Sequence, residues 1–163
     1  MPEEVFVHVS AYSSPQEARA DFADLRSKRR HATDGRGFDA ALVYRDRSGE
    51  IKVRKRERTT GKGLRTGVGV GAVLGAVLPP TIPLSVALNT TARGAVSYLR
   101  KGMSRADIAT LGEALTEGQA ALVILAEADL EDYVTRCTSR SLRQVSRELN
   151  IAVRELEQKL AAG

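Results

Sequence analysis

The chain has 163 residues and a net charge of +5, and 42% of its residues are hydrophobic and 28% charged. This composition is typical of a folded globular chain and excludes a disordered one, and the length allows a buried core. The single cysteine, Cys137, excludes an intramolecular disulfide framework and indicates a reducing compartment. Because Met-Pro-Glu-Glu lacks the basic start and apolar run of a secretory signal, we expect the cytoplasm or the cytoplasmic face of a membrane.

The first 60 residues predict a strand, a helix and a strand hairpin. Valines alternate with other side chains from Val5 to Val9, which is typical of a strand. Ser14 and Pro15 are typical of a helix start, and this helix is expected to end near Arg30. A two-stranded hairpin follows, with its strands at Phe38–Tyr44 and Ile51–Arg56 and its turn at Arg47–Gly49.

A glycine-rich segment comes next and predicts a helical hairpin. Four of its glycines are four residues apart and would form one stripe without side chains on a helix: Gly63, Gly67, Gly71 and Gly75. Since each costs about 1 kcal/mol relative to alanine in a helix, the stripe indicates close packing against another backbone. Prolines separate a first arm, from about Lys62 to Leu78, from a second arm, from about Leu84 to Lys101. The second arm contains a weaker row of small residues at Ala87, Thr91 and Ala95.

The rest of the chain predicts alternating helices and strands. Ser104 is expected to cap a helix. The continuous apolar run from Ala120 to Ala126 is typical of a strand buried on both faces. The remaining predicted elements are a short helix capped by Asp129, a strand at Leu142–Arg147 and a final helix capped by Asn150.

The order of these elements predicts an α+β fold. The first four, joined to the helix after Ser104 and the strand Ala120–Ala126, match the βαββαβ pattern of a ferredoxin-like sheet. The glycine-rich segment is then an inserted glycine-zipper helical hairpin. We therefore expect residues 1–60 and 103–163 to form the two parts of an α/β domain, with the hairpin inserted as residues 61–102.

Several stretches resemble those of one family. They are Gly37-Phe38-Asp39-Ala40-Ala41-Leu42-Val43, Ser48-Gly49-Glu50, the glycine-rich hairpin, Leu111-Gly112-Glu113-Ala114-Leu115 and Gly118-Gln119-Ala120-Ala121-Leu122-Val123. With them the chain resembles a bacterial family of uncharacterised predicted membrane proteins, a domain of unknown function in which a small α/β domain is interrupted by a glycine-zipper hairpin. The resemblance implies a fold and membrane association rather than a chemistry.

The hairpin allows several interpretations. A single transmembrane span is excluded, because the uncharged first arm, Gly67 to Leu78, is roughly 18 Å long and a bilayer core is about 30 Å thick. A membrane-inserted hairpin agrees with the uncharged stretch from Thr66 to Ala92 and with the positive residues on both sides of it. Packing against copies of itself in an oligomer, or within the chain, requires no lipid.

A run of basic residues precedes the hairpin. It could contact anionic lipid headgroups, at about 1 kcal/mol per residue near the surface, or phosphates, or it could be a solvated strand face. Nothing else in the sequence supports nucleic-acid binding, because aromatic residues are only 4% of the chain and the strands lack the paired aromatic residues of an RNA-binding sheet. The run consists of Lys52, Arg54, Lys55, Arg56, Arg58, Lys62 and Arg65.

Other patterns indicate structure rather than chemistry. The segment Gly67–Ala72 fits a relaxed dinucleotide-binding fingerprint. However, it does not directly follow a strand, and no acidic residue lies about 20 positions further on, where this fingerprint requires one. His8 and His31 are interpreted as structural, and their spacing from Cys137 does not suit a metal. We interpret Glu127, Asp129, Glu131 and Asp132 as carboxylates of a helix start. We expect no catalytic residue, cofactor or metal.

These observations predict a non-catalytic protein that uses its glycine-zipper hairpin to insert into a membrane or to self-associate. One alternative is a soluble homo-oligomer, a ring or filament built by hairpin packing. The second alternative is a small ligand- or nucleic-acid-binding ferredoxin-like domain. The expected partners are other copies of the chain and an anionic membrane surface, and the sequence identifies no small-molecule substrate.

Overall fold

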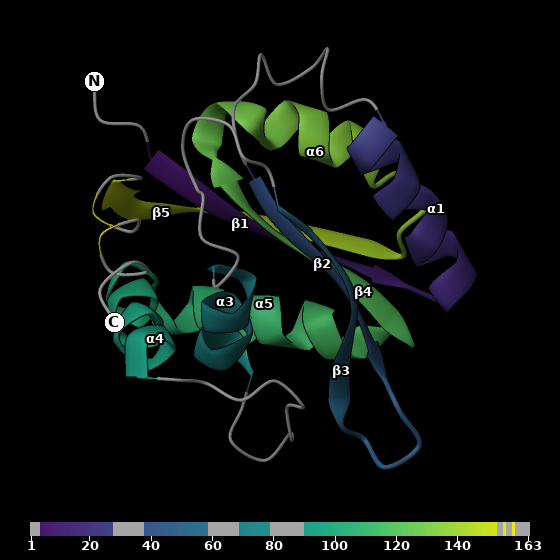
Figure 1. The fold of residues 1–163 in the computed structure, drawn as a ribbon, viewed down its shortest axis with the longest axis horizontal. Coiled ribbons are helices and arrows are strands. Elements are labelled where there is room, and N and C mark those ends of the chain that lie inside the picture. Colours follow the sequence, from purple (N-terminus) through teal and green to yellow (C-terminus); the bar gives the residue numbers. More distant parts are fainter. Residues whose placement is uncertain are drawn as a thin grey trace.

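The computed structural model describes residues 4–27, 38–58, 69–78 and 90–152, together with Glu155 and Gln158. Within these residues, five strands form one antiparallel sheet in the order β3-β2-β4-β1-β5 (Figure 1). The strands are β1 (Glu4–Tyr12), β2 (Phe38–Arg45), β3 (Ile51–Arg58), β4 (Ala120–Glu127) and β5 (Arg143–Ala152). The helices are α1 (Pro15–Ser27), α3 (Gly69–Val77), α4 (Thr90–Lys101), α5 (Arg105–Glu117) and α6 (Glu131–Cys137), which a 3₁₀ turn, η1 (Ala128–Leu130), precedes. The chain is therefore a mixed α/β structure, as the sequence predicts.

Strand β4 is the centre of the sheet. It pairs with β1 on one side and with β2 on the other, and all eight of its residues are buried. This confirms the strand predicted from the apolar run Ala120–Ala126. A strand buried on both faces requires apolar side chains at every position rather than at alternate ones.

Helices cover both faces of the sheet (Figure 1). On one face, Phe22 of α1 and Tyr133 of α6 pack in one core with Leu122 of β4. On the other face, α3, α4 and α5 pack in a second core that includes Val123 of β4. Leu122 and Val123 lie in different cores because successive side chains of a strand point to opposite faces.

The strand order differs from the order that the ferredoxin-like prediction requires. In that prediction β1 would lie between β3 and β4, whereas within the described residues it lies between β4 and β5, and β3 pairs with β2 at one edge of the sheet. The residue types explain the difference. The apolar run Ala120–Ala126 of β4 is stable only in the middle of the sheet, whereas β3 has the sequence IKVRKRER, and charged residues are typical of an exposed edge.

Two predicted helix starts are wrong. Asn150 lies inside β5, because this strand continues along β1 until Ala152 lies opposite Glu4. Asp129 lies inside η1, and neither η1 nor α6 has a side-chain cap. Glu131 and Asp132 do lie in the first turn of α6, where the helix dipole favours acidic residues.

The predicted cap of α5 is confirmed. The Oγ of Ser104 accepts a hydrogen bond from the backbone N–H of Asp107 at 3.0 Å. The cap satisfies one of the backbone donors that every helix start leaves without an intrahelical partner.

Candidate functional site

Helix α3, which belongs to the first arm of the glycine-rich segment, packs inside the chain. Helix α3 contacts α4, α5, β2 and β4. Its apolar side chains from Ala72 to Leu74, together with Ala76 and Val77, are at most 3% exposed. Of the predicted packing residues, Gly71 and Gly75 lie in α3, Thr91 and Ala95 lie in α4, and Gly63, Gly67 and Ala87 lie outside the described residues.

The end of α3 is held closely by α5 and α4. A Cβ atom placed on Gly112 of α5 would lie only 2.6 Å from the carbonyl oxygen of Val77, so this glycine permits the contact between the two helices. The guanidinium of Arg100, in α4, donates hydrogen bonds to the carbonyl oxygens of Gly75 at 3.1 Å and Ala76 at 3.4 Å. These carbonyls belong to the last turn of α3, which has no intrahelical donors for them.

A cavity of about 460 Å³ lies between the end of α3, the end of α4 and one face of α5. Most of its wall is apolar. The opposite face of α5, with Leu111 and Leu115, is buried against the sheet, so the cavity occupies the side of α5 that faces away from the sheet. The lining residues are Ala76, Val77, Leu78, Arg100, Arg105, Ile108, Ala109, Gly112, Glu113 and Thr116.

Three charged side chains lie among the lining residues of this cavity: Arg100, Arg105 and Glu113. Arg105 is exposed, and no hydrogen bond or ion pair of its guanidinium is found among the residues that the structure describes. As the first residue of α5, it adds a positive charge to the positive end of the helix dipole. The charges around the cavity therefore favour an anion.

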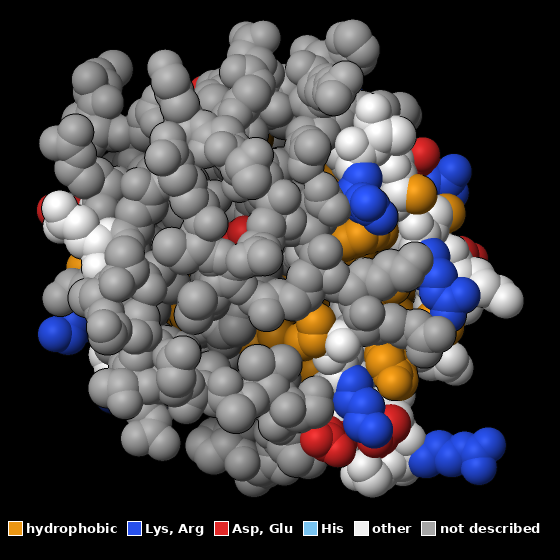
Figure 2. Space-filling view, viewed as in Figure 1, with side chains coloured by type: hydrophobic (Ala, Val, Ile, Leu, Met, Phe, Trp, Pro, Cys, Tyr) orange, Lys and Arg blue, Asp and Glu red, His pale blue; other side chains and the backbone are white. Residues whose placement is uncertain are grey.

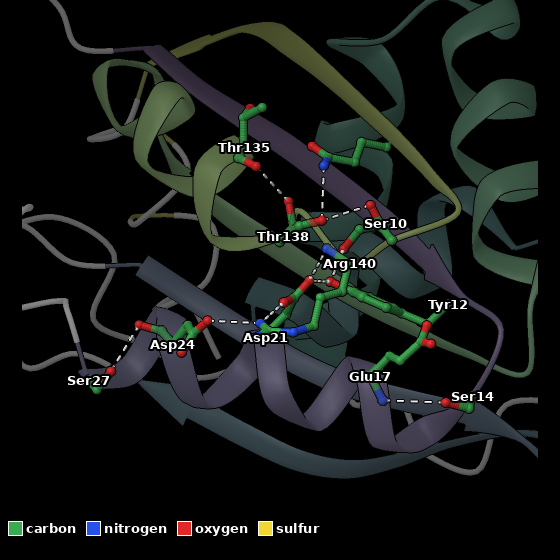
Figure 3. Close-up of polar contacts among 12 residues, drawn as sticks. Ser10, Tyr12, Ser14, Glu17, Asp21, Asp24, Ser27, Thr135, Thr138 and Arg140 are labelled. Carbon is green, nitrogen blue, oxygen red and sulfur yellow. Dashed lines mark hydrogen bonds and ion pairs between the residues drawn. The ribbon is translucent and has the colours of Figure 1, made fainter.

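A separate polar network lies on the opposite face of the sheet (Figure 3). Asp21 of α1 is fully buried and accepts hydrogen bonds from the Tyr12 hydroxyl at 2.7 Å and from the Arg140 backbone N–H at 3.1 Å. The Arg140 guanidinium also lies 2.6 Å from Asp21 and 2.9 Å from Asp24. Burial, above all, raises the pKa of Tyr12. These contacts hold α1 against the turn after α6. The sequence did not predict this network, because its residues are far apart in the chain.

The basic run is only partly described. Lys52 forms an ion pair with Asp46 at 3.3 Å, and a hydrogen bond from the Ser48 hydroxyl contributes most to lowering the pKa of Asp46 to about 2. Figure 2 shows basic and acidic side chains together at the lower right, where Figure 1 places the end of the β2–β3 hairpin. Four other basic residues of the run have their backbones in β3: Arg54, Lys55, Arg56 and Arg58. Lys62 and Arg65 lie outside the described residues.

The described residues contain neither a metal-binding cluster nor a membrane-spanning helix. Within the described residues, no group of three or more His, Cys, Asp or Glu side chains could hold a metal ion. In the same part of the chain, no helix has the length and apolar character needed to cross a membrane. Cys137, the last residue of α6, is buried in the core that α1 and α6 form with the sheet, and His31 lies outside the described residues.

Comparisons of the chain with protein-family models, with curated proteins and with solved structures give no match. Function must therefore be inferred from the geometry alone. The cavity beside Gly112 is the strongest candidate site, because its shape and its charges together define one class of ligand.

Proposed function

We propose that the protein is a ligand-binding α/β domain whose cavity between α3, α4 and α5 binds an amphipathic anion. The single observation that carries this proposal is one cavity with mainly apolar walls and two guanidinium groups. Its volume of about 460 Å³ lies within the range of small-molecule sites, which extends from about 300 to 1,000 Å³.

The lining residues indicate how such a ligand would lie. Its hydrocarbon tail would cover Leu78, Ile108 and Ala109, and burial stabilises it by about 25 cal/mol for each Å² of apolar surface removed from water. Its anionic head would contact Arg105, because Arg100 already donates to the carbonyls of α3. Glu113 also lines the cavity. Its negative charge would repel a second negative charge on the ligand, so a ligand with a single negative charge is favoured.

Calorimetric titration of the full chain with dodecanoate tests this proposal. We expect dodecanoate to bind, and dodecyltrimethylammonium, with the same tail and a positive head, to bind at least tenfold more weakly. Arg105→Glu should weaken dodecanoate binding at least tenfold, whereas Lys101→Glu, the same charge change at a residue that does not line the cavity, should have little effect. Ala109→Trp should also weaken binding, because it fills the cavity.

Two results would contradict the proposal. One is that dodecanoate does not bind. The other is binding that Arg105→Glu and Ala109→Trp leave unchanged, since the ligand would then lie elsewhere on the protein. Melting curves of each variant without ligand would show whether the substitution itself disturbs the fold.

Membrane or self-association through the glycine-rich hairpin is a second candidate function. The observation that favours it is the absence of charge from Thr66 to Ala92 between two positively charged flanks. One observation counts against it. To insert into a membrane or to pack against another copy, α3 would have to leave the hydrophobic core that it forms with the sheet. Light scattering, and sedimentation with vesicles of phosphatidylcholine and phosphatidylserine, distinguish the possibilities. A monomeric mass without vesicle binding would exclude this function, and assembly or binding that Gly67→Leu abolishes would support it.

We also propose a ferredoxin-like unit within the sheet, with different members from those first predicted. Strands β1, β2, β4 and β5 follow one another as β1-α1-β2 and β4-α6-β5, and α1 and α6 share a core. Their order in the sheet, β2-β4-β1-β5, is the order of such a unit. In this proposal β3 is an added edge strand, and the inserted helical segment supplies α3 and α4.

A further inference from the structure

Three side chains form a hydrogen-bonded chain on the face of the sheet that α1 and α6 cover. His8 of β1 is fully buried, and Ser146 lies directly opposite it on β5. The Ser146 Oγ lies 2.5 Å from Nδ1 of His8, and the Thr138 Oγ1 lies 3.2 Å from Nε2. The cluster is separate from the cavity beside Gly112, which lies on the other face of the sheet.

The partners of Thr138 determine where the imidazole proton lies. Thr138 follows α6 and donates its single hydroxyl proton to the carbonyl oxygen of Val134 at 2.9 Å. Its oxygen therefore accepts a hydrogen bond from the Nε2–H of His8. Nδ1 then has a free lone pair and accepts the hydroxyl proton of Ser146. Burial lowers the pKa of His8 to about 4, so the ring is neutral at pH 7.

This arrangement has the parts of an activated nucleophile. A hydroxyl lies within hydrogen-bond reach of a base, and a third group orients the base. Ser146 is half-buried on β5, an edge strand of the described sheet, whereas His8 is enclosed. A reagent would approach the hydroxyl from the exposed side of Ser146, while its base is shielded from water.

We propose that Ser146 is an acyl-acceptor nucleophile and that His8 is its general base, with Thr138 as the positioning residue. The Ser146 oxygen forms a bond to the carbonyl carbon of an activated ester, and its proton passes to Nδ1 of His8. The bond between that carbon and the leaving alcohol then breaks, and the alcohol departs with the proton from His8. The acyl group is transferred to Ser146, and no oxidant or metal takes part.

The surroundings of Ser146 indicate the charge of the substrate. Glu148 lies two residues further along β5, opposite Phe6, and therefore on the same face as Ser146. The pKa of Glu131 is raised, by burial first and then by the charge of Glu148, so these two carboxyl groups lie close together. An acidic neighbourhood disfavours an anionic ester, and the substrate class is therefore a neutral or cationic acyl ester.

The test uses p-nitrophenyl acetate, which is a neutral activated ester, with the full chain at pH 7. We expect a burst of p-nitrophenol of about one equivalent and one acetyl group that peptide mapping places on Ser146. Ser146→Ala should abolish the burst. Ser141→Ala, which removes a nearby hydroxyl bonded to a backbone carbonyl rather than to a histidine, should leave it unchanged.

Variants of the base and of the positioning residue complete the experiment. His8→Gln should slow acetylation about tenfold, which is below the usual range of general-base contributions because burial makes the imidazole a weak base. Thr138→Val should slow it, and Thr138→Ser should restore the rate, which a purely structural defect in packing would not allow. Acetylation confined to lysines, or equal rates at Ser146 and Ser141, would overturn the proposal and leave a structural hydrogen-bond chain. Circular dichroism of each variant separates loss of fold from loss of reactivity.

Discussion

At the scale of single residues, Asp21 is the buried charge on which the contact between α1 and the turn after α6 depends. Its carboxylate accepts hydrogen bonds from Tyr12 and from the backbone and side chain of Arg140. Asp21→Asn places an amide N–H against one of these donors and removes the charge. We expect the free energy of unfolding to fall by about 2–4 kcal/mol, measured by urea denaturation.

Asp24 provides the matched control for Asp21. It also lies within 2.9 Å of the Arg140 guanidinium, but its side chain is 36% exposed, whereas that of Asp21 is 0% exposed. Water screens such a pair, so Asp24→Asn should lower the free energy of unfolding by less than about 1 kcal/mol. Equal effects of the two substitutions would contradict the network as described.

Gly112 allows two opposing effects to be compared at one position. An alanine stabilises a helix by about 1 kcal/mol relative to glycine, which alone predicts that Gly112→Ala is stabilising. The added Cβ would, however, lie 2.6 Å from the Val77 carbonyl oxygen, and backbone must move to relieve this contact. Because overpacking typically costs about 1–3 kcal/mol, we expect a lower melting temperature for Gly112→Ala than for the exposed control Glu113→Ala. A rise above wild type would show that α3 and α5 are not in close contact.

At the scale of elements, the position of α3 depends on a side chain from α4. Arg100→Met keeps much of the aliphatic length but removes the two hydrogen bonds to the end of α3. We expect faster hydrogen exchange in α3 and a loss of about 1–2 kcal/mol in stability. Lys101→Met, which removes a charge from the next residue of α4, is the control. Unchanged exchange in α3 would show that Arg100 does not hold this helix.

Elements with a strong local pattern could be predicted from the sequence. The apolar run of β4, the alternation in β1 and the Ser104 cap each depend on neighbouring residues, and all three are present in the structure. The end of β5 could not be predicted in this way. Asn150 is a good helix cap, but pairing with β1 keeps it in the strand, and that pairing joins residues far apart in the chain.

At the scale of the whole molecule, strand order and the candidate site depend on tertiary contacts. Helix α3 packs against α4 and α5, but the glycine that closely meets the end of α3 is Gly112 of α5, which is outside the predicted stripe. The cavity wall combines residues from Ala76 to Thr116 that no local pattern joins. Arg105 is an example. The sequence shows only a basic residue at a predicted helix start, and nothing in it indicates that this residue lines a cavity.

The pH dependence of stability tests the folded molecule as a whole. Burial lowers the pKa of His8 from 6.5 to about 4, so between these values the unfolded chain binds a proton that the folded chain does not. The resulting stability is complete above pH 6.5 and is lost as the pH falls towards 4. At about 1.4 kcal/mol per pH unit, the loss is about 3 kcal/mol.

Urea denaturation between pH 7.5 and 4 should show this loss of stability, in addition to any change from carboxyl groups. His8→Gln can keep the hydrogen bonds to Ser146 and Thr138 without a titratable ring, so it should show a smaller loss. An equal loss in both proteins would mean that His8 is not buried in its neutral form.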